Sequence, residues 1–167
     1  LYLSGSGTVQ KGDFGEYKPI NVVVEKGITG IGASSFSDYR SLISITLPEG
    51  VEYIGTNAFR ECDNLTSIVM PEGLKSIGGG AFYDCDNLIS VTLPDSVATI
   101  GSWAFYNCDN LTLTPEALPA DLKSIGEKAF LDCRSLTLTS LPDKLKFVDS
   151  RAFSGCVGLK SIVFPES

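Results

Sequence analysis

Five cysteines are the residues of this sequence with the most obvious capacity for chemistry, and each lies three residues after a phenylalanine. They are Cys62, Cys85, Cys108, Cys133 and Cys156. Zinc needs clustered ligands such as Cys-x-x-Cys, or histidine, and the 167-residue sequence has neither. In a stack of repeats these cysteines would lie about 5 Å apart, but parallel side chains that point into a core do not aim at one another as a disulfide requires. We therefore expect free thiols that pack as small apolar groups, with no metal and no cofactor.

Three of the cysteines begin a recurring Cys-Asp-Asn-Leu motif. Stacking would bring Asp63, Asp86 and Asp109 into a row of carboxylates, which is the kind of ligand that calcium prefers. Hydrogen bonding of Asp and Asn to the backbone of a turn explains the motif equally directly, and Arg134 and Val157 interrupt the row. Both interpretations stay open.

The sequence contains few of the residue combinations that enzymes use for catalysis. It contains no histidine, so catalysis by Ser-His-Asp, Cys-His or a histidine-bound metal is excluded. The pairs Asp84 with Asp86 and Glu61 with Asp63 are close in sequence, but they sit at repeated turns, whereas a glycosidase needs two carboxyls that face each other across a cleft. We expect a protein without catalytic activity.

The elements that position these residues are repeats. Six phenylalanines fall at intervals of 23, 23, 23, 25 and 23 residues: Phe36, Phe59, Phe82, Phe105, Phe130 and Phe153. A fixed period in this range predicts a repeat solenoid, in which stacked neighbours build one continuous core.

The sequence of each repeat predicts two structural segments, a strand and a short helical turn. In residues 65–70, Ile68 and Met70 alternate with β-favouring residues, which predicts a strand that Pro71 ends. After the turn, the spacing of Phe82 and Cys85 puts both on one face of a short helical turn. The strands should form a parallel β-sheet along the solenoid.

The chain ends differ from its middle. Residues 1–21 lack the repeat pattern and predict an N-terminal β cap, which leaves 22–167 for about six repeats of 23–25 residues. The first residue is Leu1, and residues 164–167 stop in mid-repeat, so we expect a fragment of a longer protein. The apolar runs are all too short to span a membrane.

The full unit resembles a known family. The pattern Ala-Phe-x-x-Cys-x-x-Leu-x-x-Ile-x-Leu-Pro, followed by Gly-x-x-x-Ile-Gly, is similar to the BspA-like leucine-rich repeats of bacterial surface proteins, and it is clearest in residues 58–78 and 81–101. Leu3 to Gly7 also resembles the segment that precedes the first repeat in that family. The resemblance implies a right-handed curved leucine-rich-repeat coil, secretion or cell-surface display, and adhesion to host matrix proteins or other bacteria.

The sequence departs from this pattern at four positions. Tyr39 replaces the first cysteine, Asp149 replaces a glycine, and Thr114 and Thr139 replace an isoleucine of the strand. We expect the strand near the two threonines to be re-registered or bulged.

Charge restricts the choice of partner. Residues 49–121 hold eleven acidic and two basic side chains, a net charge of −9, whereas residues 122–167 carry a net charge of +2. An acidic middle argues against nucleic acid and anionic lipid. It favours either solubility alone or the attraction of a basic protein.

Two surfaces could bind a protein partner, such as a host matrix protein or a bacterial surface component. The outward side of the strands carries small uncharged residues, among them Ser67, Val69, Ser90 and Thr92. The turns carry outward aromatic residues only in the middle of the chain, at Tyr83, Trp103 and Tyr106, and such residues often anchor interfaces. They could equally pack on the insertion at residues 115–119. A structural spacer that displays another domain is the main alternative function, and a carbohydrate-active enzyme is a remote one.

Overall fold

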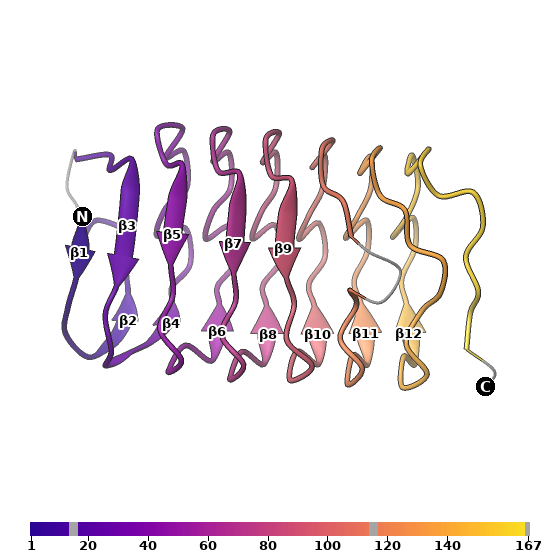
Figure 1. Cartoon of the computed structure of the whole chain (residues 1–167), viewed down its shortest axis with the longest axis horizontal. Helices are drawn as coiled ribbons and strands as arrows, with labels where there is room; N and C mark the ends of the chain where they lie inside the picture. Colours follow the sequence, from indigo (N-terminus) through magenta and orange to yellow (C-terminus); the bar gives the residue numbers. More distant parts are fainter. Residues whose placement is uncertain (14–16, 114–116, 166–167) are drawn as a thin grey trace.

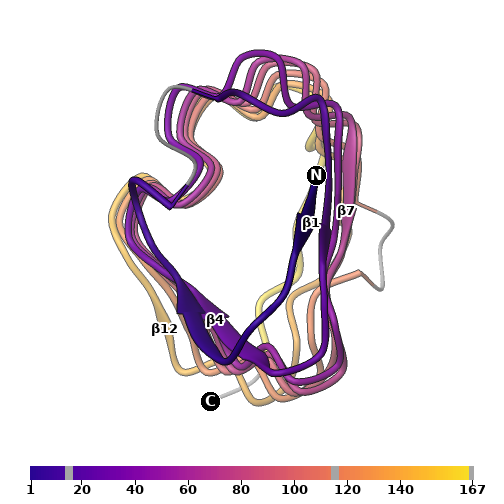
Figure 2. The same ribbon diagram turned by 90° about the vertical axis from the view of Figure 1, so that its left-hand side faces the viewer.

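Coils stacked side by side along one axis make up the protein (Figure 1), in a computed structural model that describes residues 1–13, 17–113 and 117–165. Seen along that axis, the coils overlie one another (Figure 2), and the strand register places equivalent residues of successive repeats side by side. This architecture confirms the predicted solenoid. Among the described residues, no helix has the length and apolar character needed to cross a membrane.

Two parallel sheets run along the stack. The first contains β1 (Tyr2–Leu3), β3 (Asn21–Val24), β5 (Ser44–Thr46), β7 (Ser67–Val69) and β9 (Ser90–Thr92), in that order. The second runs in the order β12 (Phe147–Val148), β11 (Ser124–Ile125), β10 (Thr99–Ile100), β8 (Ser76–Ile77), β6 (Tyr53–Ile54), β4 (Ile28–Ile31) and β2 (Gly7–Val9). The sequence predicted only the first sheet. The second uses strands of mostly two residues, too short for an alternating pattern to be visible.

The register of the sheets repeats the sequence period. In β7, Ser67 and Val69 are exposed and Ile68 is buried, and β9 shows the same alternation around Val91. Ile68 pairs with Val91 and Ser67 with Ser90, so each position lies beside its equivalent one coil later. The buried residues of every coil therefore meet in the same core.

Glycine permits the close stacking of coils at the second sheet. A Cβ atom on Gly78 would lie 2.6 Å from the backbone nitrogen of Thr56, and Gly55 and Gly101 face the preceding coil in the same way. Such distances exclude any side chain at these positions. The last coil has Asp149 in the equivalent place, where its backbone nitrogen still donates a 2.9 Å hydrogen bond to Ile125.

The phenylalanines form the centre of the core. Their rings are nearly parallel, with centroids 5.1 to 5.4 Å apart from Phe36 through to Phe153. The first five rings are fully buried, whereas Phe153 in the last described coil is only partly buried. Tyr39, which replaces the first cysteine, is buried and packs edge-on against Phe36.

The turns that carry phenylalanine and cysteine differ from the prediction. They were expected to be short helical turns, but in the described chain they contain turns and no helix. The residues two before and two after each phenylalanine have a positive φ, for example Gly80 at 61° and Asp84 at 53° around Phe82. A left-handed residue every few positions prevents a helix from propagating.

The first sheet ends earlier than the periodicity suggests. After β9, the described residues that continue its row are not assigned to strands, and only an isolated parallel bridge joins Ser140 to Val163. Near Thr139 the strand is therefore lost, whereas the sequence predicted a strand that is re-registered or bulged. Thr114 lies outside the described residues.

The first described residues form one end of the stack. β1 pairs in parallel with β3, and β2 pairs in parallel with β4, so the first residues add one strand to each sheet. β1 and β2 therefore belong to different sheets, and each pairs with a strand of the next coil. That residues 1–21 form a unit separate from residues 22–167 stays a prediction.

Candidate functional site

The three outward aromatic residues of the middle coils form one cluster on the surface. The rings of Tyr83 and Tyr106 are stacked with centroids 4.6 Å apart, and the Trp103 ring lies 5.5 Å from that of Tyr106 and 6.2 Å from that of Tyr83. Trp103 keeps 36% of its surface exposed. We call Tyr83, Trp103 and Tyr106 the aromatic cluster. The ring contacts place these residues together, as their repeat positions predicted.

The backbone at Trp103 is unusual for its residue type. Trp103 has φ 65°, in the left-handed region, and the equivalent residues of the two preceding coils are Asn57 and Gly80. Asparagine and glycine adopt this conformation readily, but a bulky side chain there costs about 1 to 2 kcal/mol. The fold thus places a tryptophan at a position where glycine or asparagine would have a lower conformational energy.

Two basic residues cover the ends of the aromatic cluster, and sequence reasoning did not assign them a role. The guanidinium carbon of Arg60 lies 4.7 Å from the centroid of the Tyr83 ring, and the Lys128 Nζ lies 4.4 Å from that of Trp103. The repeat positions place each pair in neighbouring coils. Arg60 and Tyr83 each directly follow a repeat phenylalanine, and Trp103 and Lys128 each lie two residues before one. The rings of Tyr83 and Trp103 therefore each already contact a cation of the chain itself.

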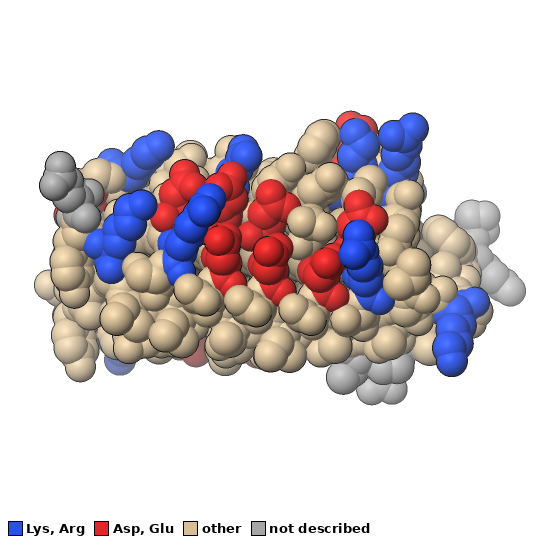
Figure 3. Space-filling model, turned by 90° about the horizontal axis from the view of Figure 1, so that it is seen from above, with Lys and Arg blue, Asp and Glu red and all other residues tan. Residues whose placement is uncertain are grey.

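Carboxylates gather over the middle coils on the face seen in Figure 3. Asp84 and Asp86 follow Tyr83 on one turn of this part of the chain. The fourth position after each of the first five repeat phenylalanines forms a row, which we call the acidic row: Arg40, Asp63, Asp86, Asp109 and Arg134. Arg40 and Arg134 lie 3.6 Å from the carboxylates of Asp63 and Asp109. The pKa of Asp86 is raised, first by burial and then by repulsion from Asp63, Asp84 and Asp109.

The asparagines of the Cys-Asp-Asn-Leu motif have a structural role. Asn64, Asn87 and Asn110 each donate a side-chain hydrogen bond of 2.6 to 2.8 Å to the backbone carbonyl of the acidic-row residue one coil earlier. The motif therefore links neighbouring coils, where the sequence suggested bonding within one turn. The described residues contain no group of three or more acidic or cysteine side chains arranged to hold a metal ion, which leaves the calcium interpretation without a donor cluster there.

Both carboxylate pairs considered for catalysis lie on turns at the surface of the stack. Glu61 accepts a 2.9 Å hydrogen bond from Arg40, which together with Arg60 lowers the pKa of its carboxyl. A carboxyl held ionised in this way cannot act as a general acid near neutral pH. Asp84 and Asp86 lie on the same turn, next to Tyr83, on the surface of the stack.

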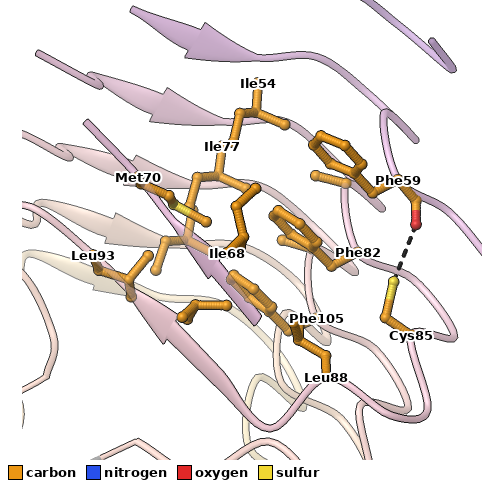
Figure 4. Close-up of a cluster of buried hydrophobic side chains, with 14 of the residues drawn as sticks. Ile54, Phe59, Ile68, Met70, Ile77, Phe82, Cys85, Leu88, Leu93 and Phe105 are labelled. Atoms are coloured by element: carbon orange, nitrogen blue, oxygen red, sulfur yellow. Dashed lines mark hydrogen bonds between the residues drawn. The ribbon is translucent and has the colours of Figure 1, made fainter. Parts of the chain in front are cut away.

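The cysteines belong to the core. All five are free and buried, and each Sγ lies 2.9 to 3.1 Å from the backbone carbonyl oxygen of the phenylalanine in the preceding coil, as Cys85 and Phe59 show in Figure 4. Burial raises the pKa of every thiol, that of Cys62 to about 12. These groups are protonated and inert at neutral pH, which confirms the prediction of small buried thiols.

The second candidate surface is the outer side of the first sheet. Ser67, Val69, Ser90 and Thr92 are all exposed there, with Val69 keeping 68% of its surface open. Val69 pairs with Thr92 across the sheet. These positions are uncharged and carry similar small residues in the preceding coil, Ser44 and Thr46, whereas the aromatic cluster occurs once among the described residues.

The fold and this surface define a class: a leucine-rich-repeat solenoid whose variable residues are presented on a regular core. A family model described as a BspA type leucine rich repeat region, in six copies, matches residues 7–115 and 112–167. The chain belongs to the BspA-type leucine-rich repeat family.

Solved structures of bacterial proteins are similar to this chain. A leucine rich repeat protein of T. pallidum is 31% identical, with a TM-score of 0.81 over 89% of this chain and 74% of that one. A leucine rich cell surface protein of Faecalibacterium prausnitzii is 25% identical, with a TM-score of 0.60 over 95% of this chain and 42% of that one. A leucine-rich repeat protein of Bacteroides ovatus, 21% identical with a TM-score of 0.51, shares the fold over 95% of this chain and 59% of its own length. A search of curated proteins found no match.

Proposed function

We propose that the protein is a non-enzymatic binding module of a secreted or cell-surface bacterial protein, and that it mediates adhesion to a host matrix protein or to other cells through the aromatic cluster. The observation that carries this proposal is the stack of Tyr83, Trp103 and Tyr106 on the surface of the middle coils, in which Trp103 keeps 36% of its surface exposed. The F. prausnitzii relative, named as a cell surface protein, supports the location.

The chemistry of the aromatic cluster suits protein binding. Tryptophan and tyrosine are the side chains most enriched among residues that dominate interface energies, because they offer a large rigid area and a polar end. Here three of them are adjacent on one turn edge, with Arg60 and Lys128 extending the surface on both sides. The outer face of the first sheet, with Ser67, Val69, Ser90 and Thr92, is the second candidate surface.

A capture experiment tests the proposal. The immobilised protein is exposed to purified matrix proteins and to bacterial cells, and compared with a variant that carries Tyr83→Ala, Trp103→Asn and Tyr106→Ala. Asparagine replaces tryptophan because Asn57 already occupies the equivalent position at φ 55°. We expect this variant to lose at least 10-fold in affinity, since central aromatic anchors are each worth about 2 kcal/mol or more.

A matched control changes exposed aromatic rings elsewhere. Tyr2 and Phe147 keep 73% and 69% of their surface exposed, far from the middle coils, so Tyr2→Ala with Phe147→Ala should leave capture unchanged. Capture that survives the aromatic variant but is abolished by Val69→Glu would move the site to the sheet. The absence of any capture by the native chain would favour the spacer function.

A further inference from the structure

A groove of about 640 Å³ runs across successive coils, separate from the aromatic cluster. The asparagines of the Cys-Asp-Asn-Leu motif form one side of it. The seventh position after each of the first four repeat phenylalanines forms the other side, with Ile43, Thr66, Ile89 and Thr112. We call this surface the amide groove. Because it extends along the stack, it has the shape needed for a long, straight ligand.

The polar atoms of the amide groove are only partly used within the protein. Each asparagine donates one hydrogen of its Nδ2 atom to the neighbouring coil, which leaves the second hydrogen and the Oδ1 atom without a partner among the described residues. Thr112 donates its hydroxyl to the Ile89 carbonyl, whereas the hydroxyl of Thr66 has no partner in the part of the chain that the structure describes. Each of these amides thus presents a donor and an acceptor in a fixed position, which can pair with the hydroxyl groups of a sugar.

The opposite side of the amide groove alternates between apolar and hydroxyl side chains. Ile43 and Ile89 keep 47% and 53% of their surface exposed, and each is followed by a threonine in the next coil. Neighbouring strands of a sheet lie about 4.8 Å apart, so this alternation repeats at about 10 Å. In a β-1,4-linked glycan, each ring advances by about one coil spacing and is turned over relative to the last. Its hydroxymethyl edge and its ring-hydroxyl edge therefore face a surface in turn, which matches isoleucine followed by threonine.

The charges beside the amide groove restrict the type of glycan. The residues that line the groove are all uncharged. Asp63, Asp86 and Asp109 of the acidic row directly precede the three asparagines in the sequence. Carboxylate or sulfate groups on a sugar chain would be repelled by these side chains, whereas a neutral chain would not.

We propose that the amide groove binds a neutral β-1,4-linked glycan chain, laid along the stack with one sugar ring per coil. This is a second binding activity, on a surface that the proposed adhesion to a protein does not use. A peptide in β conformation repeats every two residues, about 6.7 Å, and falls out of step with the coils. A polyproline II peptide, which completes a turn in about 9 Å, is nearer in step and is the alternative ligand to be tested.

Calorimetric titration of the intact chain with two hexasaccharides of glucose tests this proposal. Cellohexaose is β-1,4-linked and straight, whereas maltohexaose has the same composition but α-1,4 links, which make the chain coil. We expect cellohexaose to bind at least about 10-fold more tightly, because a coiled chain loses the hydrogen bonds to most of the coils. Cellobiose should bind more weakly than cellohexaose, since its two rings reach only two coils.

Two variants locate the site. Ile43→Ser with Ile89→Ser removes the exposed apolar contacts of the groove, and Thr66→Val removes a hydroxyl while keeping the shape of the side chain. Each should weaken the binding of cellohexaose at least about 3-fold and leave the melting temperature of the protein unchanged, because the substituted side chains are exposed. The matched control, Val69→Ser with Val157→Ser, removes exposed aliphatic side chains outside the groove and should leave affinity unchanged.

Several results would overturn the inference. These are equal affinities for the two hexasaccharides, no measurable binding of either, an equal effect of the groove variants and the control, or a proline-rich peptide that binds in the amide groove when cellohexaose does not. The variant with Tyr83→Ala, Trp103→Asn and Tyr106→Ala should bind cellohexaose as the native chain does, and a loss of binding there would also overturn the inference. Capture of proteins and cells is measured separately, so the proposed function and the glycan site can each fail while the other stands.

Discussion

Trp103 shows how a single residue can be placed against the preference of its own backbone. Positions with a positive φ recur in every coil, and Asn57, Gly80 and Trp103 occupy the same one in three successive repeats. The conformational penalty of about 1 to 2 kcal/mol for a bulky residue is similar in size to the 0.5 to 1.5 kcal/mol that an aromatic pair contributes. The two effects nearly cancel, so Trp103 adds exposed aromatic area to the surface but little to the free energy of unfolding.

The substitution Trp103→Asn is therefore expected to change the free energy of unfolding by less than about 1 kcal/mol, although it removes the largest side chain of the cluster. Urea denaturation of the native chain and the variant measures this difference. A loss above about 2 kcal/mol would mean that Trp103 is mainly a structural residue.

The buried thiols predict a loss of stability at alkaline pH. The pKa of Cys62 is raised from 9.0 to about 12, so the folded protein keeps a proton that the unfolded chain releases above about pH 9. Stability from this group is complete below pH 9 and is lost between about pH 9 and 12, at up to about 1.4 kcal/mol per pH unit. Urea denaturation at pH 7.5 and pH 9.5 should show the decrease.

The double variant Cys85→Ser with Cys108→Ser is the control for this pH dependence. A serine hydroxyl can donate to the same phenylalanine carbonyl but does not titrate in this range. The decrease between the two pH values should be smaller in the variant. An identical decrease would assign it to other groups.

At the scale of elements, close contact between coils at the second sheet depends on the row of glycines. Gly78→Ala would place a Cβ atom 2.6 Å from the Thr56 nitrogen and 2.7 Å from the Gly55 carbonyl carbon, both of them backbone atoms that cannot turn away. We expect a loss of about 2 kcal/mol or more in thermal or urea unfolding.

Gly50→Ala is the matched control for the glycine row. Its Cβ atom would lie 3.4 Å from the nearest atom, an ordinary contact, and the backbone there has no positive φ. This variant should be neutral or slightly stabilising. If both alanine variants lose stability equally, backbone freedom and not crowding decides the effect.

The sequence predicted some elements much better than others. The strand at residues 65–70 was correctly expected because Ile68 and Met70 alternate with outward residues, and β7 lies there. β8 was missed because two residues, Ser76–Ile77, cannot show an alternation. The prediction of a helical turn was wrong because the i, i+3 spacing of Phe82 and Cys85 also fits a chain of turns. The signal for positive φ was a Gly, Asn or Asp residue two positions before or after each phenylalanine, such as Gly80 and Asp84 around Phe82.

The candidate site was predictable to a similar extent. Aligned repeat positions brought Tyr83, Trp103 and Tyr106 together correctly, since equivalent residues of successive coils are neighbours in space. The positions of Arg60 and Lys128 over the rings depend on side-chain rotamers, which repeat spacing does not determine.

The whole molecule behaves as a one-dimensional array, in which each coil is stabilised by its neighbours. A phenylalanine with a ring on both sides should therefore matter more than one near an end of the stack. Phe82→Ala is expected to cost about 3 to 5 kcal/mol, because it empties a fully buried site between Phe59 and Phe105.

Phe153→Ala should cost distinctly less, because Phe153 is only partly buried and stacks on Phe130 alone among the described rings. Chemical denaturation of the two variants measures the difference. Equal losses would show that the array unfolds as a single unit in which position along the stack has no influence.

The hydrogen bonds between coils point along the long axis, and this direction has a mechanical consequence. A bond such as that from the Phe59 nitrogen to the Ala81 oxygen, 2.7 Å long, joins one coil to the next. A load applied to the two ends of the stack pulls these bonds apart in line, one layer at a time, because neighbouring coils are connected in series. Each coil of 23 residues that detaches adds roughly 70 Å of extended chain. A protein built in this way yields to tension in steps, as an extensible link instead of a rigid rod.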